Sequence, residues 1–152
     1  MTREDARPCS MATALEVIGE KWSLLVVREL ALGVHRFDRI ARNTGAPRDI
    51  LTARLRRLES AGVLEKRLYQ KRPERFEYHL TAAGKELRPI LLALAQWGER
   101  WAGDDNRVEW IHSCGEPLDL VPTCRACGEE VRGGRDVTPH YLVAPWDELT
   151  RA

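Results

Sequence analysis

The apolar residues near the start of the chain repeat with helical spacing. Residues 10–33, "SMATALEVIGEKWSLLVVRELALG", contain two apolar stripes with steps of three and four residues. The stripes are Met11, Ala14, Leu15 and Ile18, followed by Trp22, Leu25, Val26 and Leu30. Gly19 separates the stripes and Gly33 follows the second one, and glycine is common where helices end. The pattern predicts two helices divided by Gly19.

Two shorter amphipathic segments follow, "RFDRIARNTG" at 36–45 and "RDILTARLRRLESAG" at 48–62. Their apolar faces consist of Phe37, Ile40 and Ala41 in the first segment and of Leu51, Leu55 and Leu58 in the second. Gly45 provides a turn signal between them, Pro47 suits the first turn of the second helix, and Gly62 closes it. The pattern predicts two short helices joined by a glycine turn.

Residues 63–70, "VLEKRLYQ", and 75–80, "RFEYHL", mix apolar and charged residues in rough alternation on either side of "KRPE". This arrangement predicts a β-hairpin. Thr81 is then expected to cap a long helix reaching Gly103, with a kink at Pro89.

The long helix carries a wide apolar stripe. It consists of Leu87, Ile90, Leu91, Leu94, Trp97 and Trp101. A small hairpin cannot cover so wide a face, so we expect part of it to contact another subunit in a homodimer. A helix that packs wholly on its own domain remains the alternative, because periodicity does not say what covers an apolar face.

Charge divides the chain unevenly. Residues 1–103 contain 19 Lys and Arg against 13 Asp and Glu, a net of +6, whereas residues 104–152 contain 5 against 10, a net of −5. We therefore predict a domain at 1–103 that can meet a polyanion and an acidic tail at 104–152 that would be repelled by one. No apolar run is long enough to span a membrane and "MTREDARP" does not resemble a signal peptide, so we expect a cytoplasmic protein that does not contact membranes.

The order helix, turn, basic helix, hairpin and long helix predicts a mainly α, α+β fold of the winged helix-turn-helix type. The face of 48–62 opposite its leucines would enter the major groove of double-stranded DNA, and the hairpin would follow the phosphate backbone. The predicted DNA-binding residues are Arg48, Asp49, Thr52, Ala53, Arg56 and Arg57 on the helix and Lys71, Arg72 and Arg75 on the hairpin. Any one of these basic residues, taken alone, is more often a solvated surface charge.

Several motifs also resemble a known family. "CSMATALEVIGEKWSLLVVREL" and the stretch from "RFDRIARNTG" to "YHLTAAGKEL", including Cys9 and the "KW" pair Lys21 and Trp22, resemble the HxlR-type winged-helix transcriptional regulators over about residues 9–101. The resemblance implies a homodimeric repressor or activator, dimerised through its terminal helices, with two recognition helices on a palindromic operator. Pro47 departs from the small polar residue common at that position, so no hydroxyl contact is expected there.

The resemblance also suggests that Cys9 senses oxidants or electrophiles, since some relatives use a cysteine at this place; a small-molecule effector is equally open. Arg7 and the helix start at Ser10 could both favour the thiolate. A small buried residue near the dimer interface is the other interpretation of Cys9.

The acidic tail holds the remaining three cysteines. His112, Cys114, Cys124 and Cys127 are residue types that zinc prefers, and "CRACG" has the C-x-x-C-G spacing of a zinc-binding turn. We therefore predict a small zinc ribbon with a structural zinc ion. The "HSCG" arm has only one residue between its two ligands, so His140 remains an alternative fourth ligand, and Cys124 with Cys127 could instead form a redox pair or stay as unligated thiols.

Enzyme motifs are lacking. The sequence contains no phosphate-binding glycine loop, no HExxH and no G-x-S-x-G, so we expect no enzymatic activity. The competing functional class is a zinc-ribbon interaction module whose winged helix contacts proteins instead of DNA.

Overall fold

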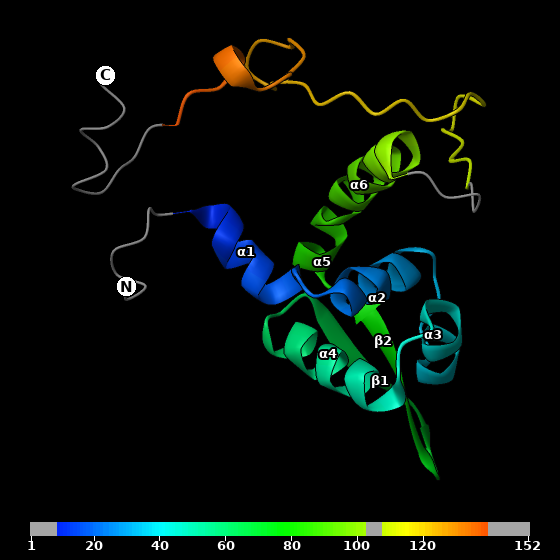
Figure 1. Cartoon of the computed structure of the whole chain (residues 1–152). Coiled ribbons are helices and arrows are strands. Elements are labelled where there is room, and N and C mark those ends of the chain that lie inside the picture. The colour runs from blue at the N-terminus through cyan, green and yellow to red at the C-terminus, as the bar shows by residue number, and fades with distance from the viewer. Residues whose placement is uncertain (1–8, 103–107, 140–152) are drawn as a thin grey trace. The chain divides into compact units, whose positions relative to one another are not determined.

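The computed structural model describes residues 9–102 and 108–139 (Figure 1). The chain divides into two units, one formed by Met11–Gly103 and the other by Met1–Ser10 together with Asp104–Ala152. The first unit combines helices with a two-stranded antiparallel sheet, which is the α+β class expected from the sequence. Within the described residues, no helix is both long and apolar enough to cross a membrane.

Helices α1 (Ser10–Ile18) and α2 (Lys21–Ala31) are separated at Gly19, as the two apolar stripes predicted. The Gly19 amide donates a hydrogen bond to the Leu15 carbonyl oxygen at 2.8 Å. A Cβ at position 19 would lie only 2.4 Å from that same oxygen. Glycine therefore allows the chain to turn closely against the end of α1.

Helices α3 (Phe37–Thr44) and α4 (Arg48–Ser60) form the predicted helix-turn-helix. Gly45 ends α3 in the left-handed conformation with φ of 72°, which glycine adopts without steric cost. Pro47 precedes α4 at its N-cap, with φ of −55° and ψ of 142°, so the prediction that it lies inside the first turn is wrong. Its carbonyl accepts the first hydrogen bond of α4, from the Leu51 amide at 2.8 Å.

The predicted hairpin is confirmed as β1 (Leu64–Lys71) and β2 (Glu74–Leu80), paired from Leu64↔Leu80 to Lys71↔Glu74. A single antiparallel bridge between Arg36 and Glu77 adds the segment before α3 to the edge of β2. The Tyr78 amide donates to the His35 carbonyl at 2.9 Å in the same place. A bridge of one residue has no periodicity, so the sequence did not reveal it.

The long C-terminal helix is two helices, α5 (Ala82–Glu86) and α6 (Arg88–Trp101), instead of one helix kinked at Pro89. Thr81 caps α5 as predicted, because its hydroxyl accepts a hydrogen bond from the Gly84 amide at 3.2 Å. Pro89 lies in the first turn of α6. A proline has no amide hydrogen to donate and is favoured in the first turn of a helix, so it starts α6 and does not bend a continuous helix.

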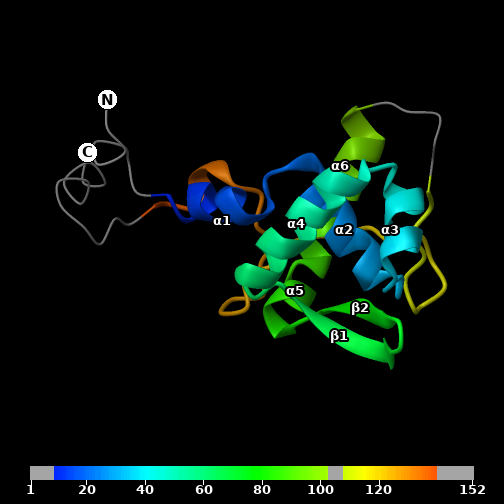
Figure 2. The same ribbon diagram turned by 90° about the horizontal axis from the view of Figure 1, so that it is seen from below.

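One hydrophobic core joins these elements. Its buried members are Val26, Val27, Leu30, Ile40, Ala46, Leu51, Leu55, Leu58, Val63, Leu64 and Leu80. Helix α2 lies between α3 and α4 and contacts both (Figure 2). The buried carboxylate of Glu29 is satisfied by the Arg28 guanidinium at 2.8 Å and the Asn43 amide at 2.7 Å, which ties α2 to α3.

The apolar stripe on α5 and α6 faces two directions. Leu87 and Leu91 pack against the core. Ile90, Leu94, Trp97 and Trp101, by contrast, are 50–70% exposed. The alternative of a helix packed wholly on its own domain is therefore wrong for this half of the stripe, and Met11 and Leu15 on α1 are similarly exposed.

Residues 108–139 contain little regular structure. A short 3₁₀ helix, η2 (Gly134–Asp136), and two single antiparallel bridges, Ile111↔Pro117 and Thr123↔Glu130, are present. The predicted ribbon of strands is reduced to these bridges within the described part of the tail. None of the residues 108–139 whose exposure is described is buried, so this segment has no hydrophobic core of its own.

Candidate nucleic-acid interface

Helix α4 presents a polar face opposite its buried leucines. Leu51, Leu55 and Leu58 are at most 2% exposed, which fixes the rotation of the helix on the core. The opposite side carries Arg48, Asp49, Ala53 and Arg56, all exposed, and Thr52, half-buried. The Thr52 hydroxyl donates to the Arg48 carbonyl of its own helix at 2.7 Å. Most of the predicted recognition residues therefore share one accessible face.

Arg48 begins this face and is held by α3. Its guanidinium lies 2.7 Å from the Asp38 carboxylate and over the ring of Phe37, 4.7 Å from the centroid. Both members of the ion pair are more than 70% exposed. Exposed pairs of this kind contribute only about 0–1 kcal/mol, so Arg48 can exchange Asp38 for another anion at little cost.

Arg57 is placed differently from the other predicted contacts. Its guanidinium donates to the Glu16 carbonyl of α1, with Nε at 2.9 Å. Arg57 is therefore bound to α1 at the edge of the exposed face of α4. The helical spacing that placed it with Arg56 could not reveal this partner, because Glu16 is distant in sequence.

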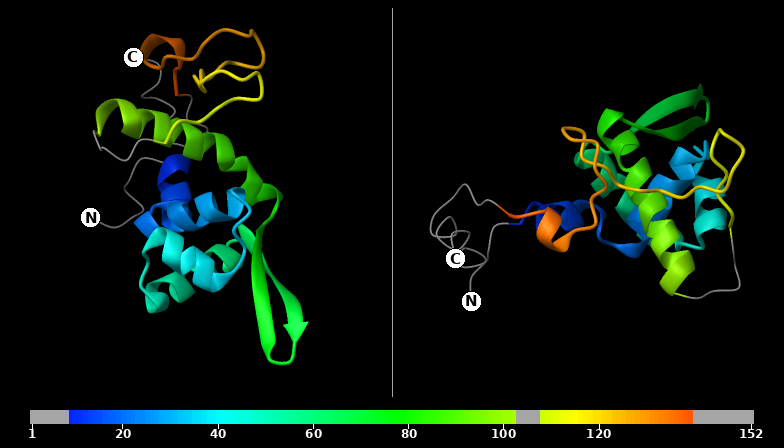
Figure 3. Two further views of the ribbon diagram at one scale, coloured as in Figure 1. Left: turned by 90° about the vertical axis from the view of Figure 1, so that its right-hand side faces the viewer. Right: turned by 90° about the horizontal axis from the view of Figure 1, so that it is seen from above.

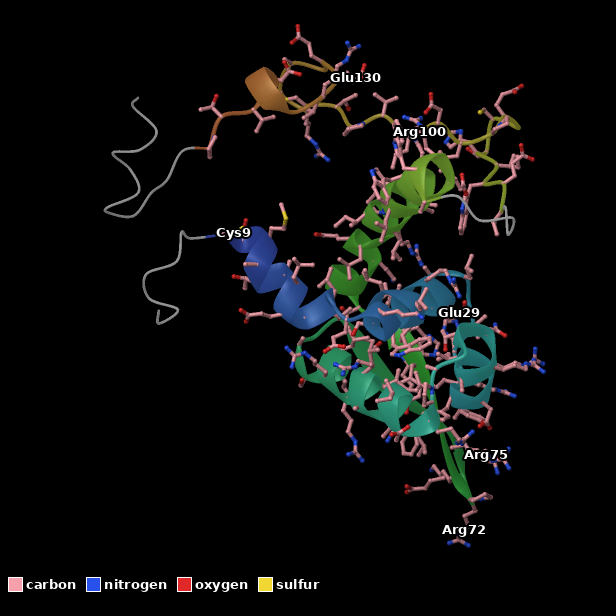
Figure 4. The ribbon with its side chains drawn as sticks, in the orientation of Figure 1. Cys9, Glu29, Arg72, Arg75, Arg100 and Glu130 are labelled. Carbon is pink, nitrogen blue, oxygen red and sulfur yellow. The ribbon has the colours of Figure 1, made fainter. Side chains whose placement is uncertain are left out.

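The hairpin forms a wing that extends well beyond the helices (Figure 3, left). Lys71, Arg72 and Arg75 are exposed, and Arg72 lies at the tip while Arg75 projects nearby (Figure 4). The Gln70 side-chain amide donates to the Arg72 carbonyl at 2.9 Å and braces the turn. The wing therefore concentrates positive charge at its outer end.

Arg36 connects this wing to α3 and was missed by sequence reasoning. Its guanidinium lies 3.2 Å from the Glu77 carboxylate and over the Tyr69 ring, 4.8 Å from the centroid. The only signal in the sequence was a basic residue before a short helix. Its pairing with the wing could not be read from spacing.

Tyr78 lies where the base of the wing meets α4. Burial of its phenol, followed by the negative charge of Glu59, raises the pKa of Tyr78 above its ordinary value, and the positive charge of Arg56 partly offsets this rise. Arg56 thus lies within electrostatic range of the wing. Helix α4 also contacts strand β1 of the wing.

This arrangement agrees with what comparison of the sequence finds. The model of the HxlR-like helix-turn-helix family matches residues 17–106, which is more than half of the chain. The chain belongs to the HxlR-like helix-turn-helix family. It is a DNA-binding transcriptional regulator with a winged helix.

Two curated relatives illustrate the range of similarity. The HTH-type transcriptional regulator Rv3095 of Mycobacterium tuberculosis is 42% identical over 134 residues, covering 86% of this chain and 84% of the relative. An alignment of that length extends beyond the winged helix into the acidic tail. The regulator sll1512 of Synechocystis is 36% identical over 114 residues, covering 70% of this chain and 84% of the relative.

Solved structures show the same fold. The crystal structure of the transcription factor PA1607 is similar with a TM-score of 0.75 and 31% identity, covering 90% of this chain and 96% of that one. The redox regulator HypR in its reduced form is similar with a TM-score of 0.56 and 32% identity, covering 60% of this chain and 92% of that one.

Cys9 of this HxlR-like regulator is exposed and directly precedes the first residue of α1. This exposure is that of a single chain, so the interpretation of Cys9 as a small residue buried near the dimer interface stays a prediction. Arg7, which was expected to favour its thiolate, lies outside the described residues. Thiol sensing stays a prediction.

The predicted zinc ligands in the tail occur as two pairs. His112 Nδ1 lies 3.1 Å from Cys114 Sγ. Hydrogen bonds from the Cys127 and Ala126 backbone lower the pKa of the Cys124 thiol. Among the described residues, no three His, Cys, Asp or Glu side chains converge to hold one ion, so the structure does not bring the two pairs together. The alternative ligand His140 lies outside the described residues.

Proposed function

We propose that this HxlR-like regulator binds duplex DNA as a homodimer, with α4 of each subunit in the major groove and each wing along the phosphate backbone. The observation that carries the proposal is the exposed polar face of α4 beside a wing whose outer end is basic, because α4 contacts strand β1 of that wing.

The residues on α4 have chemistry suited to reading base edges. Arg56 is long enough to donate to two acceptors on a guanine, and Asp49 can accept from the amino group of a cytosine. Ala53 offers an apolar surface to a thymine methyl group. Arg48, which loses little when it leaves Asp38, would bind a phosphate or a base at the start of the helix.

The wing supplies contacts that depend on charge alone. Lys71, Arg72 and Arg75 lie on a hairpin that extends past the helices, so they would reach phosphates beside the groove. The net charge of +6 over residues 1–103 favours the approach to DNA, whereas the acidic tail does not.

The homodimer rests on exposed apolar side chains. Ile90, Leu94, Trp97 and Trp101 line one side of α6, and each is at least half exposed in the single chain. Burying such a row against a second copy removes apolar surface from water at both subunits. A two-fold dimer places two recognition helices in opposite orientation, so its operator would be palindromic.

The regulator would respond to a thiol-directed signal through Cys9. Cys9 is an exposed thiol at the start of α1, and HypR, which is 32% identical, is named as a redox regulator. Oxidation of Cys9 would then alter DNA binding through the N-terminal helix. A small-molecule effector remains the alternative signal.

A winged helix that contacts proteins instead of DNA is not favoured, because the relatives are named as transcriptional regulators. The test is the affinity for duplex DNA from the promoter region of the protein's own gene, measured at several salt concentrations. Arg56→Ala should weaken binding by about 1–3 kcal/mol and relax the preference at one base pair.

Lys71→Ala should instead weaken binding to all sequences and reduce the salt dependence by about one phosphate contact. Arg88→Ala, the matched control, removes the same charge as Arg56→Ala from the exposed first residue of α6 and should bind like wild type. Equal affinity for the promoter and for unrelated DNA would refute sequence-specific binding.

A further inference from the structure

Two turns in the tail are built in the same way. The first spans residues 111–117 and the second residues 123–130, and each is closed by a single antiparallel bridge between its end residues. We call them the His112 turn and the Cys124 turn. Each contains two potential metal ligands, and a glycine with positive φ directly follows the second ligand, Gly115 at 96° and Gly128 at 77°.

The backbone hydrogen bonds of the two turns also correspond. In the His112 turn, the glycine amide donates to the His112 carbonyl at 2.9 Å, and the His112 amide donates to the Glu116 carbonyl at 2.9 Å. In the Cys124 turn, the Gly128 amide donates to the Cys124 carbonyl at 2.7 Å, and the Cys124 amide donates to the Glu129 carbonyl at 2.8 Å.

This correspondence assigns equivalent positions to the ligands. His112 matches Cys124, and Cys114 matches Cys127. In both turns, the residue whose carbonyl accepts a hydrogen bond from the backbone amide of the first ligand directly follows the glycine. The His112 turn is one residue shorter, which is the irregularity seen in the sequence spacing. The shorter turn still closes with the same hydrogen-bonded pattern.

The His112 pair also has suitable dimensions. With bond lengths of about 2.0 Å for nitrogen and 2.3 Å for sulfur, two ligands of one tetrahedral zinc ion lie about 3.5 Å apart. His112 Nδ1 and Cys114 Sγ are 3.1 Å apart, so both can bind one ion after a small adjustment. The Cys114 amide also approaches Nδ1 at 3.3 Å, which shows that this nitrogen faces residue 114.

We propose that the His112 turn and the Cys124 turn together bind one structural zinc ion through His112, Cys114, Cys124 and Cys127. One imidazole and three thiolates complete the four-coordinate tetrahedral set that structural zinc sites use. The Cys124 turn borders a hollow that is also lined by Val131, Arg132 and Asp136.

The tail needs such a crosslink. In the described part of the tail no residue of known exposure is buried, and apolar side chains such as Val108 and Ile111 are more than half exposed. A segment without its own core gains stability from metal binding, because the binding free energy becomes folding free energy. The zinc ion would therefore fix the two turns against each other.

The first experiment measures zinc in the full-length protein, purified under reducing conditions without added metal. Wild type should contain one zinc ion per chain, and Cys124→Ser and Cys127→Ser should each lose it. Cys9→Ser is the matched control, because it replaces an exposed cysteine outside the proposed ligand set and should retain the zinc. Reduced wild type with far less than one zinc per chain, or full zinc content in Cys124→Ser, would overturn the proposal.

The second experiment tests whether the His112 turn supplies ligands, using cobalt substituted for zinc. His112→Ala should shift the visible absorption of tetrahedral cobalt, because water would replace the imidazole beside three thiolates, and His112→Cys should give the different shift that reports a fourth thiolate. Unchanged cobalt absorption in His112→Ala would contradict the role of His112. Protein purified without reductant that contains a Cys124–Cys127 disulfide, and that binds no zinc after reduction, would show a redox pair and would also refute the zinc site.

Zinc content and cobalt absorption both report metal binding and not operator binding. A protein that contains zinc but fails to bind DNA would refute the proposed function alone, and the reverse result would refute only the zinc site.

Discussion

Replacing Gly84 with alanine should disrupt the joint between the wing and the C-terminal helices. Gly84 is buried in α5, where an added Cβ would lie 2.1 Å from the Val63 carbonyl oxygen and 3.0 Å from Leu80 Cδ2. The closest contact is with backbone, which cannot move aside as a flexible side chain can. Either α5 or the entry to β1 must shift.

These contacts set the loss in the free energy of unfolding that Gly84→Ala should cause. Overpacking in a core costs about 1–3 kcal/mol. The Val63 carbonyl also accepts hydrogen bonds from the Thr81 amide and the Thr81 hydroxyl, both at 3.1 Å. Each of these hydrogen bonds that is weakened adds about 1 kcal/mol to the loss of stability. The better helix propensity of alanine offsets about 1 kcal/mol of this loss. The expected loss in the free energy of unfolding is about 3 kcal/mol.

Thermal unfolding followed by circular dichroism measures this loss. In a domain of this size, about 3 kcal/mol corresponds to a fall in Tm of more than about 10 °C. Gly98→Ala is the matched control, because Gly98 lies in α6 with nothing within 4 Å of an added Cβ. It should be neutral or stabilising by up to about 1 kcal/mol. A Gly84→Ala protein that melts at or above the wild-type temperature would refute the packing argument.

Two further predictions concern assembly and signalling. Leu94→Glu places a charge in the exposed row on α6, so it should lower the molar mass measured by light scattering from dimer to monomer and weaken operator binding together; a dimer that persists would place the interface elsewhere. Oxidant should release wild-type protein from its operator but not the Cys9→Ser variant, and release that survives this substitution would exclude Cys9 as the sensor.

The elements of the winged helix could be predicted because their apolar periodicity reports which face is buried. Leu51, Leu55 and Leu58 are buried as their spacing required, and Gly19 divides the first two helices. The break at Leu87 was harder to foresee, since a proline near the start of a helical pattern fits both a kink and a new helix.

The partners of individual side chains could not be predicted in the same way. Spacing along α4 placed Arg57 beside Arg56, but the Glu16 carbonyl that binds Arg57 lies on another helix. Arg36 likewise meets Glu77 only after the wing has folded against α3. Such contacts depend on tertiary packing, which one sequence does not encode in a local pattern.

The central claim is that one surface, made of α4 and the wing, reads a specific operator. Nuclease footprinting of purified protein on the promoter region of its own gene tests it most directly, with Arg56→Ala and Arg88→Ala compared at equal concentration. We expect wild type and Arg88→Ala to protect a palindrome with half-sites spaced by about one helical turn, or a multiple of it, and Arg56→Ala to protect it only at higher concentration. Equal protection by all three proteins would contradict the role of Arg56, and the absence of any protected site would contradict operator recognition at that promoter.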